Sequence, residues 1–277
     1  MRKNGVADVI FCAGSNIEAG ASNEGEVSDI GGLRRLVVNI CKTMVFEAGA
    51  DFEVDWLVVN PVEGQDTPTI KASASGTASF EPADMEKPGT SNFGVPGGND
   101  AMRVVVPEFG TKMIAQNNFL ASEINTISAT LMVKVDLAEF TEISMNVFDN
   151  AAANESLAIT VAGEGDKVTL PRFCVGDKEG FARWDNASFL VRLTLCGGAD
   201  NFLRSFQPIV VRFNVTNPAA SQAAPVISIG SVGAFTIETD SMERPMAPYQ
   251  GVTLGDHPMK VVVPEFVVNP KPSTLRT

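Results

Sequence analysis

Short runs in which apolar and polar residues alternate recur along the whole chain, and turn residues such as Gly, Pro and Asn separate them. This alternation is seen at residues 33–38 and 189–194, and again at residues 127–137 and 141–148. We expect the last two runs to pair with each other as antiparallel strands. A period of two residues is typical of a strand with one buried face. The pattern therefore predicts an all-β protein.

The predicted strands fall into two matching series. The first series covers residues 6–12, 33–40, 52–59, 69–72, 77–81 and 102–106, and the second covers residues 167–174, 188–196, 208–215, 226–229, 234–239 and 259–263. The second half also contains the runs at 127–137 and 141–148 and a short one at 157–161.

One eight-residue phrase occurs twice. Residues 102–109 read MRVVVPEF, and residues 259–266, which lie 157 positions further on, read MKVVVPEF. Thirteen of the twenty-five residues at 85–109 are identical to their counterparts at this spacing. A chain of this length does not contain such a phrase twice by chance, so we interpret it as a tandem duplication. We predict that the phrase is the last strand of each copy, buried on both faces and ended by Pro107 or Pro264.

The duplication predicts two domains. The expected fold class is all-β, with two tandem, internally duplicated antiparallel β-sandwich domains of Ig-like or jelly-roll-like type. The first domain would span residues 1–111, a linker with a short helix residues 112–122, and the second domain residues 123–266. Residues 267–277 contain two prolines and are expected to form an extended C-terminal tail.

The first copy lacks the opening strands of the second. Counting back 157 positions from Ile127 leads to a position before Met1, so the runs at 127–137 and 141–148 have no counterpart. A sandwich without its first strands has an unpaired edge. The linker, the second domain or an arm of a neighbouring subunit could cover that edge. Our hypothesis is that strand addition or close packing within an assembly completes the first domain, with the tail as one candidate donor.

Each half contains one early and one later cysteine: Cys12 and Cys41 in the first, Cys174 and Cys196 in the second. Two interpretations stay open at this point. The thiols could be free and buried as small apolar groups, or each half could hold one disulfide. Zinc binding is not expected, because no close cysteine pair or Cys/His set exists.

Composition and charge limit the classes of partner. The net charge of −12 repels phosphate backbones, so direct nucleic-acid binding is not expected. The longest apolar runs, such as residues 104–106, are far too short to span a bilayer, so no membrane partner is expected. Residues 1–4 are a short basic start with no apolar signal core behind it, which predicts a soluble protein made in the cytosol.

A search for catalytic groups finds little. The only histidine, His257, lies in a Gly/Pro turn and is interpreted as a surface residue, so Ser-His-Asp and Cys-His arrangements have no support. The Gly-rich stretches at 95–100 and 163–166 lack the residues of a phosphate-binding loop and are interpreted as turns. Glu108 and Glu265 occupy equivalent places in the two copies, and nothing in the sequence brings them together as a catalytic pair.

Metal and carbohydrate sites are equally poorly supported. The acidic segments 24–29 and 164–166 lack the spacing of an EF-hand. Trp56, Trp184 and Tyr249 are the only large polar aromatic residues, which is few for a sugar-binding face, and Trp56 is interpreted as a core residue. We therefore predict a chain without catalytic, metal-binding or cofactor-binding residues that is not an enzyme.

The expected function follows from this architecture. We predict a structural protein that self-assembles into a larger particle, most plainly a virus or phage component such as a tail-tube, capsid or outer-shell protein. Its partners would be copies of itself and other virion proteins, and its location the virion, after synthesis in the host cytoplasm. The alternative is an Ig-like adhesion or carbohydrate-binding module.

Overall fold

The structure is a computed structural model that describes residues 11–12, 26–30, 33–40, 49, 57–146, 148, 151–163, 169–245 and 249–265, and for 11–12, 26–30 and 33 the backbone alone. Contacts group the chain into two compact units, Met1–Asn60 and Pro61–Thr277. The division into 1–111, 112–122, 123–266 and 267–277 followed the sequence repeat rather than packing, and it stays a prediction.

The described residues form strands and turns and no helix, which confirms the all-β class. The strands are β1 (Phe11–Cys12), β2 (Glu26–Ile30), β3 (Leu33–Val37), β4 (Asn39–Ile40), β5 (Lys71–Ala74), β6 (Phe80–Asp84), β7 (Phe109–Gln116), β8 (Ile124–Val133), β9 (Glu142–Asn146), β10 (Ser156–Gly163), β11 (Cys174–Val175), β12 (Lys178–Glu179), β13 (Phe181–Asp185), β14 (Leu190–Thr194), β15 (Ile209–Thr216), β16 (Ser228–Val232) and β17 (Ile237–Ser241). Within the same ranges, no helix has the length and hydropathy that crossing a bilayer requires.

The described residues of the first unit form two small antiparallel pairs. Strands β2 and β3 form a hairpin in which Glu26 faces Val37, and β1 pairs with β4. The strand predicted at 33–40 is thus present as β3 and β4, with a break at Val38. Residues 6–10 and 52–56 of two other predicted strands lie outside the described residues, and residues 57–59 are not in a strand.

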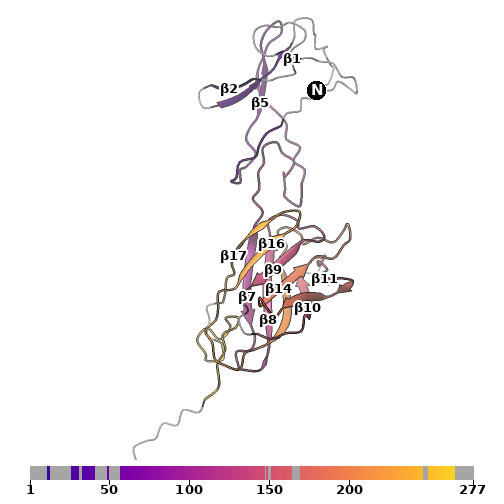
Figure 1. Cartoon of the computed structure of the whole chain (residues 1–277). Coiled ribbons are helices and arrows are strands. Elements are labelled where there is room, and N and C mark those ends of the chain that lie inside the picture. The colour runs from indigo at the N-terminus through magenta and orange to yellow at the C-terminus, as the bar shows by residue number, and fades with distance from the viewer. Residues whose placement is uncertain are drawn as a thin grey trace, which may run out of the picture. The chain divides into compact units, whose positions relative to one another are not determined.

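One nine-stranded sheet makes up the sandwich of the second unit (Figure 1). Strand β10, inside this sheet, pairs with β13 through Ser156 to Ala158, and with β15 through Ile159 to Gly163. On the β13 side the sheet continues through β14, β9 and β16 to β17, and on the β15 side through β8 to β7. All of these neighbours are antiparallel.

The alternation of the sequence explains why these strands form. In β8, every second residue from Asn125 onward is buried and the residues between them are half-buried. Strand β15, its neighbour, alternates between buried and more exposed residues in the same manner. Such strands bury one face completely and shift all their apolar residues to the solvent if the register slips by one position, which fixes the register of the sheet.

The two ends of the sheet meet on the far side, so that the sandwich is nearly closed. Directly after β17, Glu243 pairs in parallel with Met113 of β7. An ion pair between Lys112 of β7 and Asp240 of β17, at 2.9 Å, lies beside this contact. Closure of this kind removes an edge that would otherwise be free to pair with another chain.

The core of the second unit is built around a cluster of aromatic rings. Phe148 lies with its ring centroid 6.0 Å from that of Trp184 and 5.8 Å from that of Phe213. All three side chains are fully buried, and the Trp184 ring N–H donates to Asn186 Oδ1 at 2.6 Å. Ring contacts of this geometry add about 1 kcal/mol each to the burial of the side chains themselves.

A disulfide joins Cys174 of β11 to Cys196, which follows β14, with 5.1 Å between the Cα atoms. This decides between the two interpretations of the cysteines for the second half. The bond closes a segment of 22 residues, and such a closure restricts the unfolded chain by about 3 kcal/mol. In the first half, Cys41 and the side chain of Cys12 lie outside the described residues.

Two predictions about the repeated phrase and the linker are wrong. Residues 102–106 and 259–263 form only isolated bridges, at Val104, Val261 and Val262, and neither segment is buried on both faces. The first residue of each phrase, Met102 or Met259, has a positive φ angle, which does not fit an extended strand at that position. Residues 112–116, predicted as part of a helical linker, belong to β7.

Candidate interaction face

The two copies of the repeat have nearly the same backbone. We call residues 65–106 the first repeat segment and residues 222–263 the second repeat segment. Met102 has a φ angle of 64° and its counterpart Met259 one of 63°. Phe93 and its counterpart Gln250 have φ angles of 46° and 48°. Left-handed angles are uncommon for residues other than glycine, so this agreement indicates the same turn in both copies.

Hydrogen bonds repeat at the same spacing. The Gln65 N–H donates to the Val104 carbonyl at 2.9 Å and the Val104 N–H to the Gln65 carbonyl at 3.1 Å, and Gln222 and Val261 make the same two bonds at 3.0 Å. The hairpin of β5 and β6 has the same register and the same bulge as that of β16 and β17. The sequence repeat is therefore a repeat of local structure over these two segments.

The second repeat segment is covered by another stretch of the chain, residues 112–121, which we call the covering strip. At its start, the Glu243 N–H donates to the Lys112 carbonyl at 2.8 Å, and the Ile114 N–H donates to the Glu243 carbonyl at 2.9 Å. The Ile114 side chain is fully buried in the core. The strip thus binds the second repeat segment as an added strand does.

Gln116 is the centre of this contact. Its side-chain Nε2 donates to the carbonyls of Gly255 and Lys260, each at 2.9 Å. Its Oε1 accepts from the Met259 N–H at 2.8 Å and from Asn125 Nδ2 at 2.8 Å. One buried side-chain amide therefore binds three main-chain groups of the turn, namely the carbonyls of Gly255 and Lys260 and the N–H of Met259.

The end of the strip continues the pairing. The Val262 N–H donates to the Phe119 carbonyl at 2.8 Å, and the Ala121 N–H donates to the Val262 carbonyl at 3.1 Å. The Phe119 ring packs edge-on against Tyr249, with 6.2 Å between the ring centroids. The strip therefore contacts both the phrase and the turn that precedes it.

No described residue covers the first repeat segment in this way. The main-chain groups that correspond to those bound by the strip belong to Glu86, Gly98, Asn99, Met102, Arg103 and Val105. The Met102 carbonyl accepts a bond from Gln65, as the Met259 carbonyl does from Gln222. The groups equivalent to those that the strip binds have no partner among the described residues.

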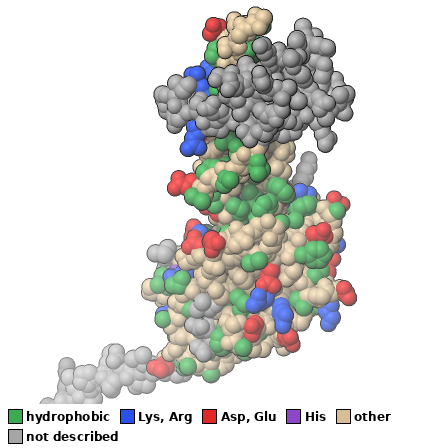
Figure 2. Space-filling model, turned by 45° about the horizontal axis from the view of Figure 1, so that its top comes forward, with side chains coloured by type: hydrophobic (Ala, Val, Ile, Leu, Met, Phe, Trp, Pro, Cys, Tyr) green, Lys and Arg blue, Asp and Glu red, His purple; other side chains and the backbone are tan. Residues whose placement is uncertain are grey.

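Side chains of the first repeat segment are also more exposed than their counterparts in the second. Met85 is 52% exposed, whereas its counterpart Met242 is 4% exposed. Phe80 is 56% exposed, whereas its counterpart Ile237 is 4% exposed. We call this surface of the first repeat segment, with Met85, Glu86 and the turn at 98–103, the uncovered face. Figure 2 draws one side of the molecule and shows groups of hydrophobic side chains with charged and other polar side chains around them.

Residues 93–94 of the first repeat segment, which precede the turn at 98–103, contact the sandwich. The Phe93 carbonyl accepts from the Asp136 N–H at 2.8 Å. A Cβ added to Gly94 would lie 2.1 Å from Ser205 Oγ and 2.2 Å from Asp136 Oδ1, so only glycine fits. Asp136 is buried and accepts from the Ser205 N–H at 2.7 Å and from the Arg204 guanidinium at 3.0 Å. This contact fixes the first repeat segment without covering Met85 or Glu86.

The histidine prediction is wrong in one respect. His257 is buried rather than on the surface, and its Nε2 lies 2.6 Å from the Pro245 carbonyl, to which it donates. Its counterpart Asp100 accepts from the Gly89 N–H at 2.7 Å. Both side chains therefore hold the turn to the segment that follows the preceding hairpin, which is a structural role.

The carboxylates considered from the sequence are separate. Glu108 forms an exposed ion pair with Lys134, and the Lys134 N–H donates to the Glu108 carbonyl at 3.0 Å. Glu265 is exposed and has no ion-pair partner within the described ranges. Residues 95–100 are turns, as predicted. Trp56 and residues 24–25 and 164–166 lie outside the described residues, and residues 26–29 belong to β2.

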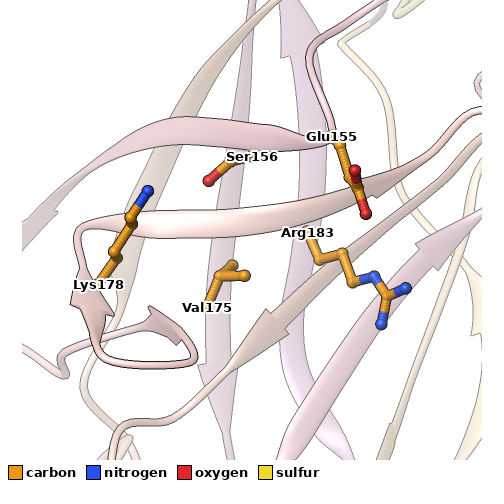
Figure 3. Close-up of a pocket in the computed structure, with 5 residues that line it drawn as sticks. All are labelled: Glu155, Ser156, Val175, Lys178 and Arg183. Atoms are coloured by element: carbon orange, nitrogen blue, oxygen red, sulfur yellow. The ribbon is translucent and has the colours of Figure 1, made fainter.

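A shallow pocket of about 310 Å³ lies on the outer side of the sandwich, between the β11–β12 hairpin and the β10–β13 pair. Figure 3 shows Lys178, Arg183, Glu155, Ser156 and Val175 around it. Lys178, Arg183 and Glu155 are exposed. The Ser156 Oγ is the exception, because this atom is buried and has no hydrogen-bond partner among the described residues. One hydroxyl without an adjacent base is not an activated nucleophile, so the lining gives no catalytic arrangement.

Two carboxylates of the described residues, Asp240 and Asp185, have lowered pKa values. A hydrogen bond from the Lys112 side chain, followed by one from the Ser241 N–H, lowers the pKa of Asp240 below its usual value of 3.8. Hydrogen bonds from the Ser188 side chain and the Ala187 N–H lower the pKa of Asp185 in the same way. Within the described ranges, no group of three or more His, Cys, Asp or Glu residues is placed to hold a metal ion.

Sequence reasoning did not find Gln116. The residue lies in the segment predicted as a linker, and the groups it binds are 139 and 144 positions away in the chain. The repeat was the one signal available. It marks the turn at 255–260 as a local structure that occurs twice in the chain, but it does not show which other residues bind that turn.

Comparisons with known proteins give little more. No family model matches this sequence, and no curated protein matches it significantly. Among solved structures, the chain is similar to an uncharacterized protein from Nocardia farcinica that is described as having an immunoglobulin-like fold. The identity is 12%, the TM-score is 0.29, and the alignment covers 55% of this chain and 99% of that one. A match of this size does not assign the chain to a family.

Proposed function

We propose that the chain is a non-enzymatic structural protein that assembles into a larger particle through the uncovered face of its first repeat segment. One observation supports this most: the same local structure is covered by ten residues of chain in the second copy, whereas no described residue covers it in the first. An open strand edge with exposed apolar side chains is a site for pairing with another chain. In this proposal, residues 1–111 are an incomplete copy of the sandwich domain at 123–266.

The class of particle that we propose is a virion, with the chain as a tail-tube, capsid or outer-shell subunit among copies of itself and other virion proteins. The net charge of −12 suits a surface that must not adhere to nucleic acid. The Cys174–Cys196 disulfide suits a particle that leaves the reducing cytosol after synthesis in the host cell.

Size-exclusion chromatography with light scattering, followed by negative-stain imaging, tests this proposal. We expect a concentration-dependent rise in mass and regular rings, tubes or shells. The variant Met85→Asp places a charge on the uncovered face and should reduce assembly, whereas Phe140→Asp changes an exposed residue of the sandwich and serves as the control. A monomer at all concentrations, under oxidising conditions, would contradict the proposal.

A second candidate function is an adhesion or carbohydrate-binding module outside the cell. The disulfide favours it as well, because such bonds persist in extracellular proteins. Binding of the oxidised chain to a glycan array or to cell surfaces, without any change in its own mass, would support this alternative.

A further inference from the structure

We infer that the uncovered face binds an extended segment of a partner polypeptide that carries an apolar residue, a glutamine two positions later and an aromatic residue three positions after that. This inference rests on the proposed function and names the chemistry of the partner. The pattern is that of Ile114, Gln116 and Phe119 in the covering strip.

The second repeat segment provides the template. Glu243 receives the strip through its N–H and carbonyl, and the equivalent groups of Glu86 are free of partners among the described residues. Because Met102 and Met259 have the same φ angle, the turns of both copies direct their groups alike. A segment that fits one face therefore fits the hydrogen-bonding pattern of the other.

The turn selects glutamine in particular. In the second copy one amide donates twice and accepts from the Met259 N–H. The corresponding groups in the first copy are the carbonyls of Gly98 and Arg103 and the N–H of Met102. Glutamate of the same length has no N–H to donate, and it would leave both carbonyls without partners. Shorter polar side chains do not reach from a strand to the turn.

An extended polypeptide suits this face better than a small molecule does. The Glu86 groups without a partner among the described residues are placed to pair with the main chain of a parallel strand, as those of Glu243 do. The side chains of Met85 and Phe80 add apolar area to the same surface. Strand addition combines main-chain bonds with side-chain pockets in this manner.

The occupant that we infer is a segment of a partner polypeptide. The described residues contain two such faces and one covering strip, and the strip is already bound to the second repeat segment. The tail at 266–277 is the other stretch in the same register, since Phe266 corresponds to Phe109. It places Lys271 where the strip has Ile114 and Ser273 where the strip has Gln116. Neither residue supplies the required apolar group or amide.

A labelled synthetic peptide of residues 109–122, FGTKMIAQNNFLAS, tests the inference by fluorescence anisotropy with the oxidised full-length chain. We expect saturable binding. A peptide with Gln116→Glu should bind roughly tenfold more weakly, because two carbonyls lose their donors. A peptide of residues 266–277 should bind no better than the Gln116→Glu peptide.

Variants of the chain locate the binding site. Met85→Asp should abolish peptide binding, and Phe140→Asp should leave it unchanged. Binding that survives Met85→Asp, equal binding of the tail peptide, or no binding of the 109–122 peptide would each overturn the inference. The result is independent of particle formation: a chain that assembles but ignores the peptide contradicts this inference alone, and one that binds the peptide but never assembles contradicts only the proposed function.

Discussion

Met102 and Met259 have the same backbone conformation, with φ angles of 64° and 63°, but different surroundings. Met259 is fully buried beneath the covering strip, whereas Met102 is 38% exposed. The difference cannot come from local sequence, because both residues stand at the start of the same phrase. It comes from the residues that contact the two methionines. The covering strip with Gln116 binds Met259, whereas no described residue covers Met102 in this way.

Gln116 should be essential for the stability of the second unit. Replacing it by Leu removes the donors to the Gly255 and Lys260 carbonyls and the acceptor for the Met259 N–H. Leaving these buried groups without partners is expected to lower the free energy of unfolding by about 3 kcal/mol. Urea unfolding followed by Trp184 fluorescence would measure the change. Gln222→Leu removes the bond that this side chain donates to the Met259 carbonyl and gives a comparison on another contact of the same turn.

Glycine should be required at position 94 and dispensable at position 251. These residues are counterparts with φ angles of 72° and 78°. An added Cβ meets Ser205 Oγ and Asp136 Oδ1 at Gly94, but nothing within 4 Å at Gly251. We expect Gly251→Ala to lower stability by about 1 kcal/mol through backbone strain alone, and Gly94→Ala by roughly 3 kcal/mol because the junction must also move. Equal midpoints in thermal unfolding would contradict the contact at Gly94.

The disulfide should contribute measurably to stability. Replacing Cys174 and Cys196 together by Ala releases a closure of 22 residues and should lower the free energy of unfolding by about 3 kcal/mol. Reduction of the unmodified chain should produce at least this loss, because it removes the Cys174–Cys196 restriction on the unfolded state as well. Mass spectrometry of the alkylated chain provides the control that the bond was present before reduction.

Strands with a clear alternation of apolar and polar residues could be predicted from the sequence. The ends of strands, and the strands without such an alternation, could not. Strand β8 alternates over its whole length and was recognised. Strand β7 was mistaken for a helical linker because Met113, Ile114 and Leu120 have a spacing that also suits a helix. Its true period shows only in burial, where Ile114 and Gln116 are both buried. Strand β13 was missed because it lies within a charged segment that resembles a loop.

The uncovered face was predictable in outline and not in detail. The absence of counterparts for 127–137 and 141–148 led to the prediction of an incomplete first copy, which stays a prediction. The groups left open could not be identified, since a sequence does not show that Gln116 reaches a turn 139 positions away. The same limit applied to His257, whose bond to Pro245 depends on how the turn folds back.

Acid should weaken the closure between β7 and β17. The hydrogen bond from Lys112 lowers the pKa of Asp240 in the folded state below its usual value of 3.8. The contribution of this carboxylate to stability is therefore present above pH 3.8 and is lost as the pH falls through the lower folded-state value. An NMR titration of the Asp240 carboxyl should show a midpoint below 3.8, and Lys112→Met should move that midpoint upward. A midpoint at or above 3.8 in the unmodified chain would contradict the pairing.

A Met→Asp substitution should change the free energy of unfolding by very different amounts at the two counterpart methionines, Met242 and Met85. Met242→Asp puts a charge into a buried site without an ionic partner and should lower the free energy of unfolding by about 4 kcal/mol. Met85→Asp changes a side chain that is 52% exposed and should alter stability by less than about 0.5 kcal/mol. Urea unfolding of both variants at low protein concentration, where chains are separate, would make the comparison. A large loss in Met85→Asp under these conditions would mean that the chain covers its own first repeat segment in solution, and the assembly contacts would then have to be sought elsewhere.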